Sequence, residues 1–309
     1  GTDSLVELLE AAPAIQVIVT SRERLNVRGE HVYPVQGMEY DLSVTLTKAA
    51  SLPAVRLFVQ SARRIRAAFE LNAMTLAPVL RICHLVQGMP LGLELAAAWV
   101  EALSVEEIAA EIEANADFLA NDWRDAPARQ RSMRAVFDWS WRLLSDAEQA
   151  ALRQLSVFRG GFTRDAARVV AGASLRILTD LTRKSLLQRS ERGAAVGRYE
   201  MHELVRQFAA EQNVAAGDAE AVAARHAAYY AAFLKDQETS LTTSGQSVAL
   251  NAIGVEIDNV RAAWRWLVAH RQVEGIAQAL EAYSLFCELR SWRQEGEDAL
   301  RDAYARLAP

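Results

Sequence analysis

The sequence predicts a mainly α-helical protein made of several modules, with short extended segments near its start and one β-hairpin near its middle. Apolar residues recur at helical spacing through most of the 309 residues. Two extended runs flank a glycine-containing turn at 191–197, a pattern typical of a hairpin. Hydrophobic residues make up 51% of the chain, which is enough for several cores.

The first 44 residues carry the pattern of the edge of an α/β sheet. A helix is expected over Leu5–Leu9, a buried strand over Ile15–Val19 and a second short extended segment over 31–35. In an open α/β sheet, ligands bind beyond the carboxyl ends of the strands. Arg22 follows the first strand closely and is therefore a candidate phosphate ligand. The alternative is that Arg22 is a surface residue beside Glu23 in a solvated turn.

A loop that could hold phosphates is missing from this sequence. Such a loop needs a glycine-rich turn followed by Lys and Ser or Thr, because main-chain N–H groups and an ammonium together bind the phosphates. The only lysines are Lys48, Lys184 and Lys235, and none of them follows a glycine. The chain is therefore not expected to be a complete nucleotide hydrolase.

Residues 45–115 predict a small helical module. Apolar residues between Val55 and Ile65 lie on one helical face, and a helix from Thr75 is expected to end at Gly88. Pro90 then begins another helix, and Ser104 and Glu107 form a capping box for the next. Pro90 is a candidate to pack its rigid ring against a nucleotide base. The alternative is that the glycine and the proline only mark helix ends.

Residues 116–215 predict a winged helix, which is a set of helices followed by a β-hairpin. A polar linker at 116–126 precedes a helix around Met133 and a capping box that begins at Ser145. A helix over 175–184 leads into the predicted hairpin. His202 stands where the second extended run meets a helix and could reach a phosphate there. The alternative is a histidine whose ring is satisfied by the backbone.

The last module, residues 216–309, is expected to be entirely helical, in stacked hairpins of the repeat type. The two cysteines, Cys83 and Cys287, suggest neither a disulfide framework nor a zinc site. No apolar stretch is long enough for a membrane span and no signal peptide is visible, so we expect a cytoplasmic protein.

The net charge of −5 conceals a basic middle: residues 127–213 carry a surplus of +6. Such a surplus is consistent with DNA binding, in which case the hairpin arginines Arg189, Arg192 and Arg198 would lie on the wing. It is also consistent with packing between modules, which we prefer because the arginines are scattered rather than gathered on one helix face.

The order and spacing of these motifs are more specific than any one of them. They are Val17-Ile-Val-Thr-Ser-Arg22, Gly88-Met-Pro-Leu91, Val157-Phe-Arg-Gly-Gly-Phe162 and Met201-His-Glu203. The series resembles the bacterial NB-ARC/STAND regulatory ATPases, which are signal-responsive transcriptional regulators. The resemblance implies the end of an NTPase domain at 1–44, a helical lid at 45–115, a winged helix at 116–215 and TPR-like repeats at 216–309.

The resemblance also implies roles for three residues: Arg22 contacts the terminal phosphate, Pro90 packs on the adenine and His202 contacts the phosphates of ADP. Glu203 stands where the family has an aspartate. The intact protein is then expected to be an ADP/ATP-dependent switch and a slow ATPase that uses Mg. The segment studied lacks the Walker A and Walker B motifs, so it is expected to bind no cofactor and to have no enzymatic activity.

Three functions are therefore open. The resemblance favours the switch, with a protein or small-molecule inducer at the repeats and no direct DNA binding by this segment. The alternatives are a winged-helix DNA-binding protein and a helical-repeat scaffold for protein interactions.

Overall fold

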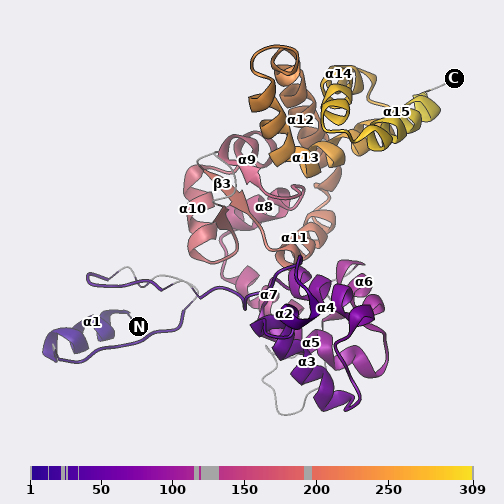
Figure 1. Cartoon of the computed structure of the whole chain (residues 1–309). Helices are drawn as coiled ribbons and strands as arrows, with labels where there is room; N and C mark the ends of the chain where they lie inside the picture. The colour runs from indigo at the N-terminus through magenta and orange to yellow at the C-terminus, as the bar shows by residue number, and fades with distance from the viewer. Residues whose placement is uncertain are drawn as a thin grey trace. The chain divides into compact units, whose positions relative to one another are not determined.

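The structure is a computed structural model that describes residues 2–12, 14–21, 25, 27–33, 35–114, 118–119, 132–190 and 197–307. Its elements are helices and a few short strands, as the sequence predicts (Figure 1). In chain order they are α1 (Thr2–Ala11), α2 (Leu46–Ala49), α3 (Pro53–Ile65), α4 (Ala73–Leu85), α5 (Pro90–Ala97), the 3-10 helix η1 (Ala98–Glu101), α6 (Val105–Ala114), α7 (Met133–Arg142), α8 (Asp146–Leu155), β1 (Phe162–Thr163), α9 (Arg164–Ala171), α10 (Leu175–Arg183), β2 (Gln188–Ser190), β3 (Arg198–Glu200), α11 (Glu203–Ala215), α12 (Ala219–Leu241), α13 (Gln246–Ala269), α14 (Val273–Leu289) and α15 (Arg293–Leu307).

The chain divides into two compact units. The first comprises Gly1–Leu143, Thr179–Leu187 and His202–Leu204, and the second comprises Leu144–Leu178, Gln188–Met201 and Val205–Pro309. Helix α10 therefore passes from the second unit into the first.

In the first unit, α3 packs on α5 and α4 packs on α6. Helix α4 begins earlier than the sequence suggested. Asn72 is its N-cap and accepts hydrogen bonds from the N–H groups of Met74 and Thr75, and Thr75 closes the capping box instead of starting the helix. The Ser104–Glu107 box is present as predicted. The core is built from fully buried side chains such as Phe58, Ile82 and Leu93.

The prediction of a buried strand over residues 15–19 is wrong. These residues form no strand, and Ile18 is 96% exposed. The described part of the second extended segment, 31–33 and 35, forms none either. A strand is held by hydrogen bonds to neighbouring strands. The sheet of the described residues contains only β1, β3 and β2, so an apolar run here has nothing to pair with.

The second unit contains the described wing and its supporting helices. Strands β2 and β3 form the predicted antiparallel hairpin, with Arg189 opposite Tyr199. A third strand, β1, pairs with the other edge of β3 and places Phe162 opposite Tyr199. Strand β1 was not predicted, because a two-residue strand shows no alternation of apolar and polar residues. Helix α8 packs on α9, and Ser145 caps α8 with the predicted box.

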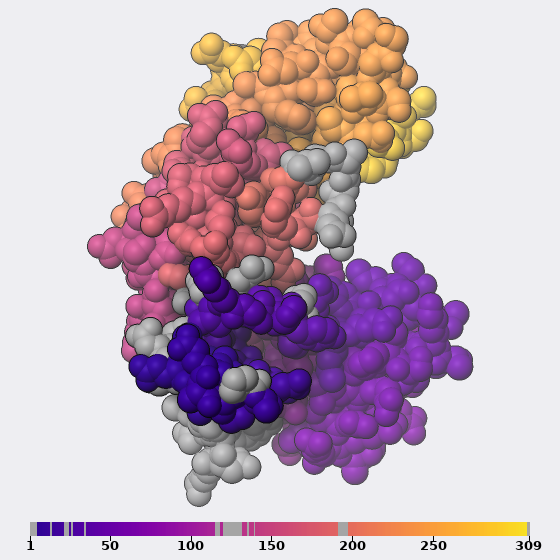
Figure 2. Space-filling view, turned by 90° about the vertical axis from the view of Figure 1, so that its left-hand side faces the viewer, coloured from indigo at the N-terminus to yellow at the C-terminus, as the bar shows by residue number. Residues whose placement is uncertain are grey.

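Helices α12 to α15, called here the helical array, follow in the same unit (Figure 1). Helix α12 packs against both α13 and α14, and it also contacts α9 of the winged helix. Figure 2 shows the array as closely packed atoms, coloured orange to yellow. None of the described helices is both long and apolar enough to span a membrane.

Candidate functional site

Helices α9 and α10 form a helix-turn-helix whose turn has a clear local cause. Thr163 caps α9 by accepting a hydrogen bond from the N–H of Ala166 at 3.2 Å. Gly172 ends α9 in the left-handed conformation, at φ 60°, which is the usual glycine C-cap. The hydroxyl of Ser174 then accepts from the N–H of Ile177 at 3.3 Å and starts α10.

Helix α10 has one apolar face and one polar face. Leu178 and Leu181 are fully buried. Arg176, Thr179, Asp180 and Arg183 recur at i, i+3, i+4 and i+7 and are exposed or partly exposed. Residues at this spacing share one helical face. The second helix of a helix-turn-helix presents such a face to the major groove of DNA.

The wing arginines do not behave as the DNA-binding alternative required. Arg198 is only 2% exposed, and its guanidinium forms an ion pair with Glu256 of α13. It also donates to the carbonyl oxygens of Gly160 at 3.0 Å and Val255 at 3.3 Å. The prediction that Arg198 lies on the surface of the wing is therefore wrong. Arg189 is exposed, and Arg192 lies outside the described residues.

The Arg198–Glu256 pair is the centre of a buried polar network. The hydroxyl of Tyr230 donates to Glu256 at 2.9 Å, and the amide of Asn259 donates to Glu256 at 2.8 Å. The same amide nitrogen donates to the Gly161 carbonyl at 2.8 Å, while its oxygen accepts from the Arg159 N–H at 2.7 Å. We call Arg198, Tyr230, Glu256 and Asn259 the wing clamp, because they tie β3 and the 159–161 turn to α12 and α13.

Burial makes the wing clamp costly to break. All four of its residues are at most 6% exposed. Removing one member of a buried ion pair leaves the other as an uncompensated charge, which costs about 3–5 kcal/mol. Gly161 is required beside it: the residue has φ +93°, and an added Cβ would lie 2.7 Å from the Tyr199 carbonyl oxygen.

His202 links two separate segments of the first unit. Its Nδ1 accepts a hydrogen bond from the Leu204 N–H at 3.1 Å, and its Nε2 lies 3.2 Å from the Val86 carbonyl oxygen. Both contacts are satisfied by the neutral ring with its proton on Nε2. Burial lowers the pKa of His202 to about 4, and the bond to Val86 offsets that effect only in part.

The structure places the predicted nucleotide ligands as follows. Pro90 is exposed at the first position of α5, four residues after Val86, so it and His202 belong to the same compact unit. Gly88 lies between Val86 and Pro90 in the sequence and has a φ of +65°. Its carbonyl oxygen accepts a hydrogen bond from the Met38 N–H at 2.8 Å. Arg22 lies outside the described residues.

Sequence reasoning missed most of the wing clamp. The available signal was in α13, where Glu256 and Asn259 interrupt the apolar stripe of Ile253, Val260 and Trp264. Polar residues at core positions need partners, so this interruption could have indicated a buried network.

Comparison with known proteins identifies one domain. Residues 144–213 match the family model of a winged helix-turn-helix domain, which confirms the predicted winged helix. The chain is 36% identical over 287 residues to a Mycobacterium tuberculosis protein named "Putative HTH-type transcriptional regulator", a match covering 91% of this chain and 31% of that protein. A Mycobacterium bovis protein of the same description matches equally well.

An uncharacterized protein of Mycobacterium tuberculosis is 34% identical over 227 residues, which cover 71% of this chain and 55% of that protein. The chain thus spans about a third of the length of the named regulators and about half of this one. No solved structure matches the chain.

We predict that Arg198→Met lowers the free energy of unfolding by about 3–5 kcal/mol, because it leaves the Glu256 carboxylate buried without its cation. Arg198→Met combined with Glu256→Met should cost less than the sum of the two single changes. Urea unfolding of the four proteins measures the coupling.

The matched control is the pair Arg261–Glu295 in the helical array, which is bidentate but about one-third exposed. Arg261→Met should cost only about 1 kcal/mol, because solvent screens the remaining charge. Equal costs at the two pairs would contradict the special role of the wing clamp.

Two histidines, the buried His226 and the part-buried His202, predict an acid-sensitive fold. Burial lowers the pKa of both His202 and His226 to about 4, from an ordinary value of 6.5. The unfolded chain therefore binds more protons between these values, so stability is complete above about pH 6.5 and falls as the pH drops toward 4. The double variant His202→Gln/His226→Gln should flatten this dependence in urea titrations. An unchanged slope between pH 5 and 7 would show that other groups cause it.

Proposed function

We propose that this chain is the part of a transcriptional regulator that binds duplex DNA, with α10 as the helix that enters the major groove. The observation that carries the proposal is the polar face of α10, which follows a helix-turn-helix and precedes a β-hairpin. The winged-helix match and the names of the relatives support it. The resemblance noted above implied no direct DNA binding, but the winged-helix match gives no support to that exclusion.

The described charges indicate how the DNA would be held. Arg176 and Arg183 lie two turns apart on α10, and Arg189 is exposed on β2. Arginines of this kind contact phosphates and position a helix in the groove. Arg198 is buried and takes no part, so the described wing contributes contacts through β2 and not through β3.

A nucleotide-dependent switch is the second candidate function, and one observation favours it. His202 reaches the main chain at Val86, just before the Gly-Met-Pro segment, within one compact unit. Pro90 would then pack on the base of ADP or ATP, with Arg22 at the terminal phosphate. Both ring nitrogens of His202 contact the main chain, so the ring would have to exchange its Val86 contact for the phosphates. The chain lacks the phosphate loop and the Mg ligands, so these 309 residues alone would supply only part of the site.

In such a switch, the helical array would receive a protein or small-molecule inducer, and the wing clamp would join the array to the winged helix. A switch of this kind requires that the nucleotide bind two states with different affinities. The array could also act only as an interaction scaffold.

The DNA-binding proposal predicts a salt-dependent affinity that depends on three arginines. The variant Arg176→Ala/Arg183→Ala/Arg189→Ala should bind a fluorescent duplex more weakly, and the slope of log affinity against log salt should fall by up to about 2.7, or about 0.9 for each lost phosphate contact. Fluorescence anisotropy at several salt concentrations measures both quantities.

The control carries three changes on α15, Arg293→Ala, Arg301→Ala and Arg306→Ala, and has the same net charge as the test variant. It should bind as the unchanged protein does. If the two variants weaken binding equally, the effect is one of net charge and the role of α10 is refuted.

For the second function, the 309-residue chain should show no binding of ATP or ADP with Mg in calorimetry. In a longer protein that contains this chain and a phosphate loop, His202→Ala should weaken ADP binding about tenfold or more, the effect of one lost charge-assisted hydrogen bond. Micromolar binding of ATP to the chain alone, or an ADP affinity unchanged in His202→Ala, would contradict the switch.

A further inference from the structure

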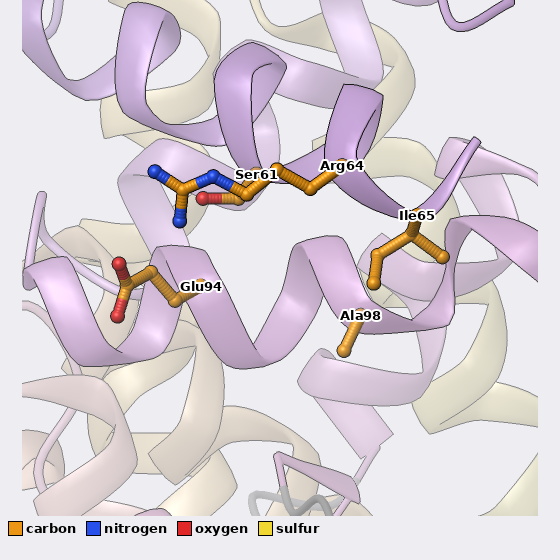
Figure 3. A pocket seen from close by; sticks show the side chains of 5 residues that line it. All are labelled: Ser61, Arg64, Ile65, Glu94 and Ala98. Atoms are coloured by element: carbon orange, nitrogen blue, oxygen red, sulfur yellow. The ribbon is translucent and has the colours of Figure 1, made fainter. Parts of the chain in front are cut away.

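A small hollow between α3 and α5 combines opposite charges with an unpaired hydroxyl. Ser61, Arg64 and Ile65 line it from α3, Glu94 lines it from α5 and Ala98 from η1. In Figure 3 the Arg64 guanidinium, the Ser61 hydroxyl and the Glu94 carboxylate lie toward one end, and Ile65 and Ala98 lie toward the other.

Ser61 is the observation that points to a ligand. Its side chain is 7% exposed, and its hydroxyl has no hydrogen-bond partner among the described residues. A serine inside a helix often bonds the carbonyl one turn earlier, but this one does not. A buried hydroxyl without a partner costs about 1–3 kcal/mol, so something outside the protein is expected to satisfy it.

The charges narrow the kind of ligand. Neither Arg64 nor Glu94 forms an ion pair with any described residue, although they border one hollow from facing helices. A group with an anion for Arg64 and a cation for Glu94 would pair both at once. Ile65 and Ala98 offer it an apolar wall.

The volume of the hollow further limits the kind of ligand that can bind there. The hollow measures about 40 Å³, which holds roughly three water-sized groups. That is far below the 300–1,000 Å³ of a typical cofactor pocket, so a nucleotide does not fit. The ammonium, the α-carbon and one carboxylate oxygen of an amino acid are three groups of this size, and they carry the required charges.

We propose that the hollow between α3 and α5 binds a small aliphatic α-amino acid, with its carboxylate on Arg64, its ammonium on Glu94 and a hydrogen bond to the Ser61 hydroxyl. The side chain lies toward Ile65 and Ala98. This site is separate from α10, and the proposal does not depend on DNA binding.

The test is thermal unfolding and calorimetry of the 309-residue chain with L-alanine as the probe. L-Alanine should raise the Tm by a few degrees at concentrations about tenfold above its Kd. N-acetyl-L-alanine lacks the ammonium and L-alaninamide lacks the carboxylate, so each should bind at least about tenfold more weakly. Absence of any shift with L-alanine, or equal binding of the three compounds, overturns the proposal.

Variants separate binding from folding. Arg64→Met and Glu94→Gln should each weaken L-alanine binding about tenfold or more, whereas Arg56→Met on α3 and Glu106→Gln on α6 should leave it unchanged. Ser61→Ala should weaken binding while the Tm without ligand stays the same or rises, because an unpaired hydroxyl has been removed. A lower Tm for Ser61→Ala together with unchanged L-alanine binding would show that the hydroxyl serves the fold alone.

Discussion

The second unit depends on one buried ion pair, Arg198–Glu256. Its two charges come from residues 58 positions apart, one on a strand of the wing and one in the helical array. Neither charge can be tolerated alone away from water, so β3 and α13 must stay together if either is to stay folded. Tyr230 and Asn259 complete the shell of hydrogen bonds around the carboxylate. Strand β3, the 159–161 turn and the beginning of the array are therefore expected to unfold together.

This constraint changes how the basic middle of the chain is understood. A surplus of positive charge predicts a nucleic-acid surface only where the charges are exposed. Arg198 is buried in an ion pair with Glu256. Arg159 and Arg206 donate hydrogen bonds to the main-chain oxygen of Ser156. The described residues near the helix-turn-helix still present exposed cations, which lie on α9, α10 and β2. The packing explanation of the surplus therefore holds for some of the arginines, and the DNA-binding explanation stays a prediction for those that face solvent.

The helices and their caps could be predicted from sequence because their causes are local. The boxes at Ser104 and Ser145 are both present, since each needs only residues within one turn. The prediction of a strand at 15–19 was wrong because a strand needs hydrogen-bonding partners from distant parts of the chain. The wing clamp was missed for the same reason: nothing near Arg198 in the sequence shows that Glu256 will neutralise it. The ring of His202 lies at the start of α11 and is satisfied by the backbone, as in the alternative given for it. Its partner Val86 lies 116 residues away and could not be named from the sequence.

The central claim is that α10 contacts DNA while the wing clamp stays closed. Hydrogen–deuterium exchange of the chain with and without duplex DNA tests it most directly. The account predicts that DNA slows exchange in residues 175–183 and leaves the already protected amides of residues 198–200 and of α13 unchanged. Slower exchange at 198–200 together with faster exchange around Glu256 would contradict it, because Arg198 would then have left the clamp to bind DNA.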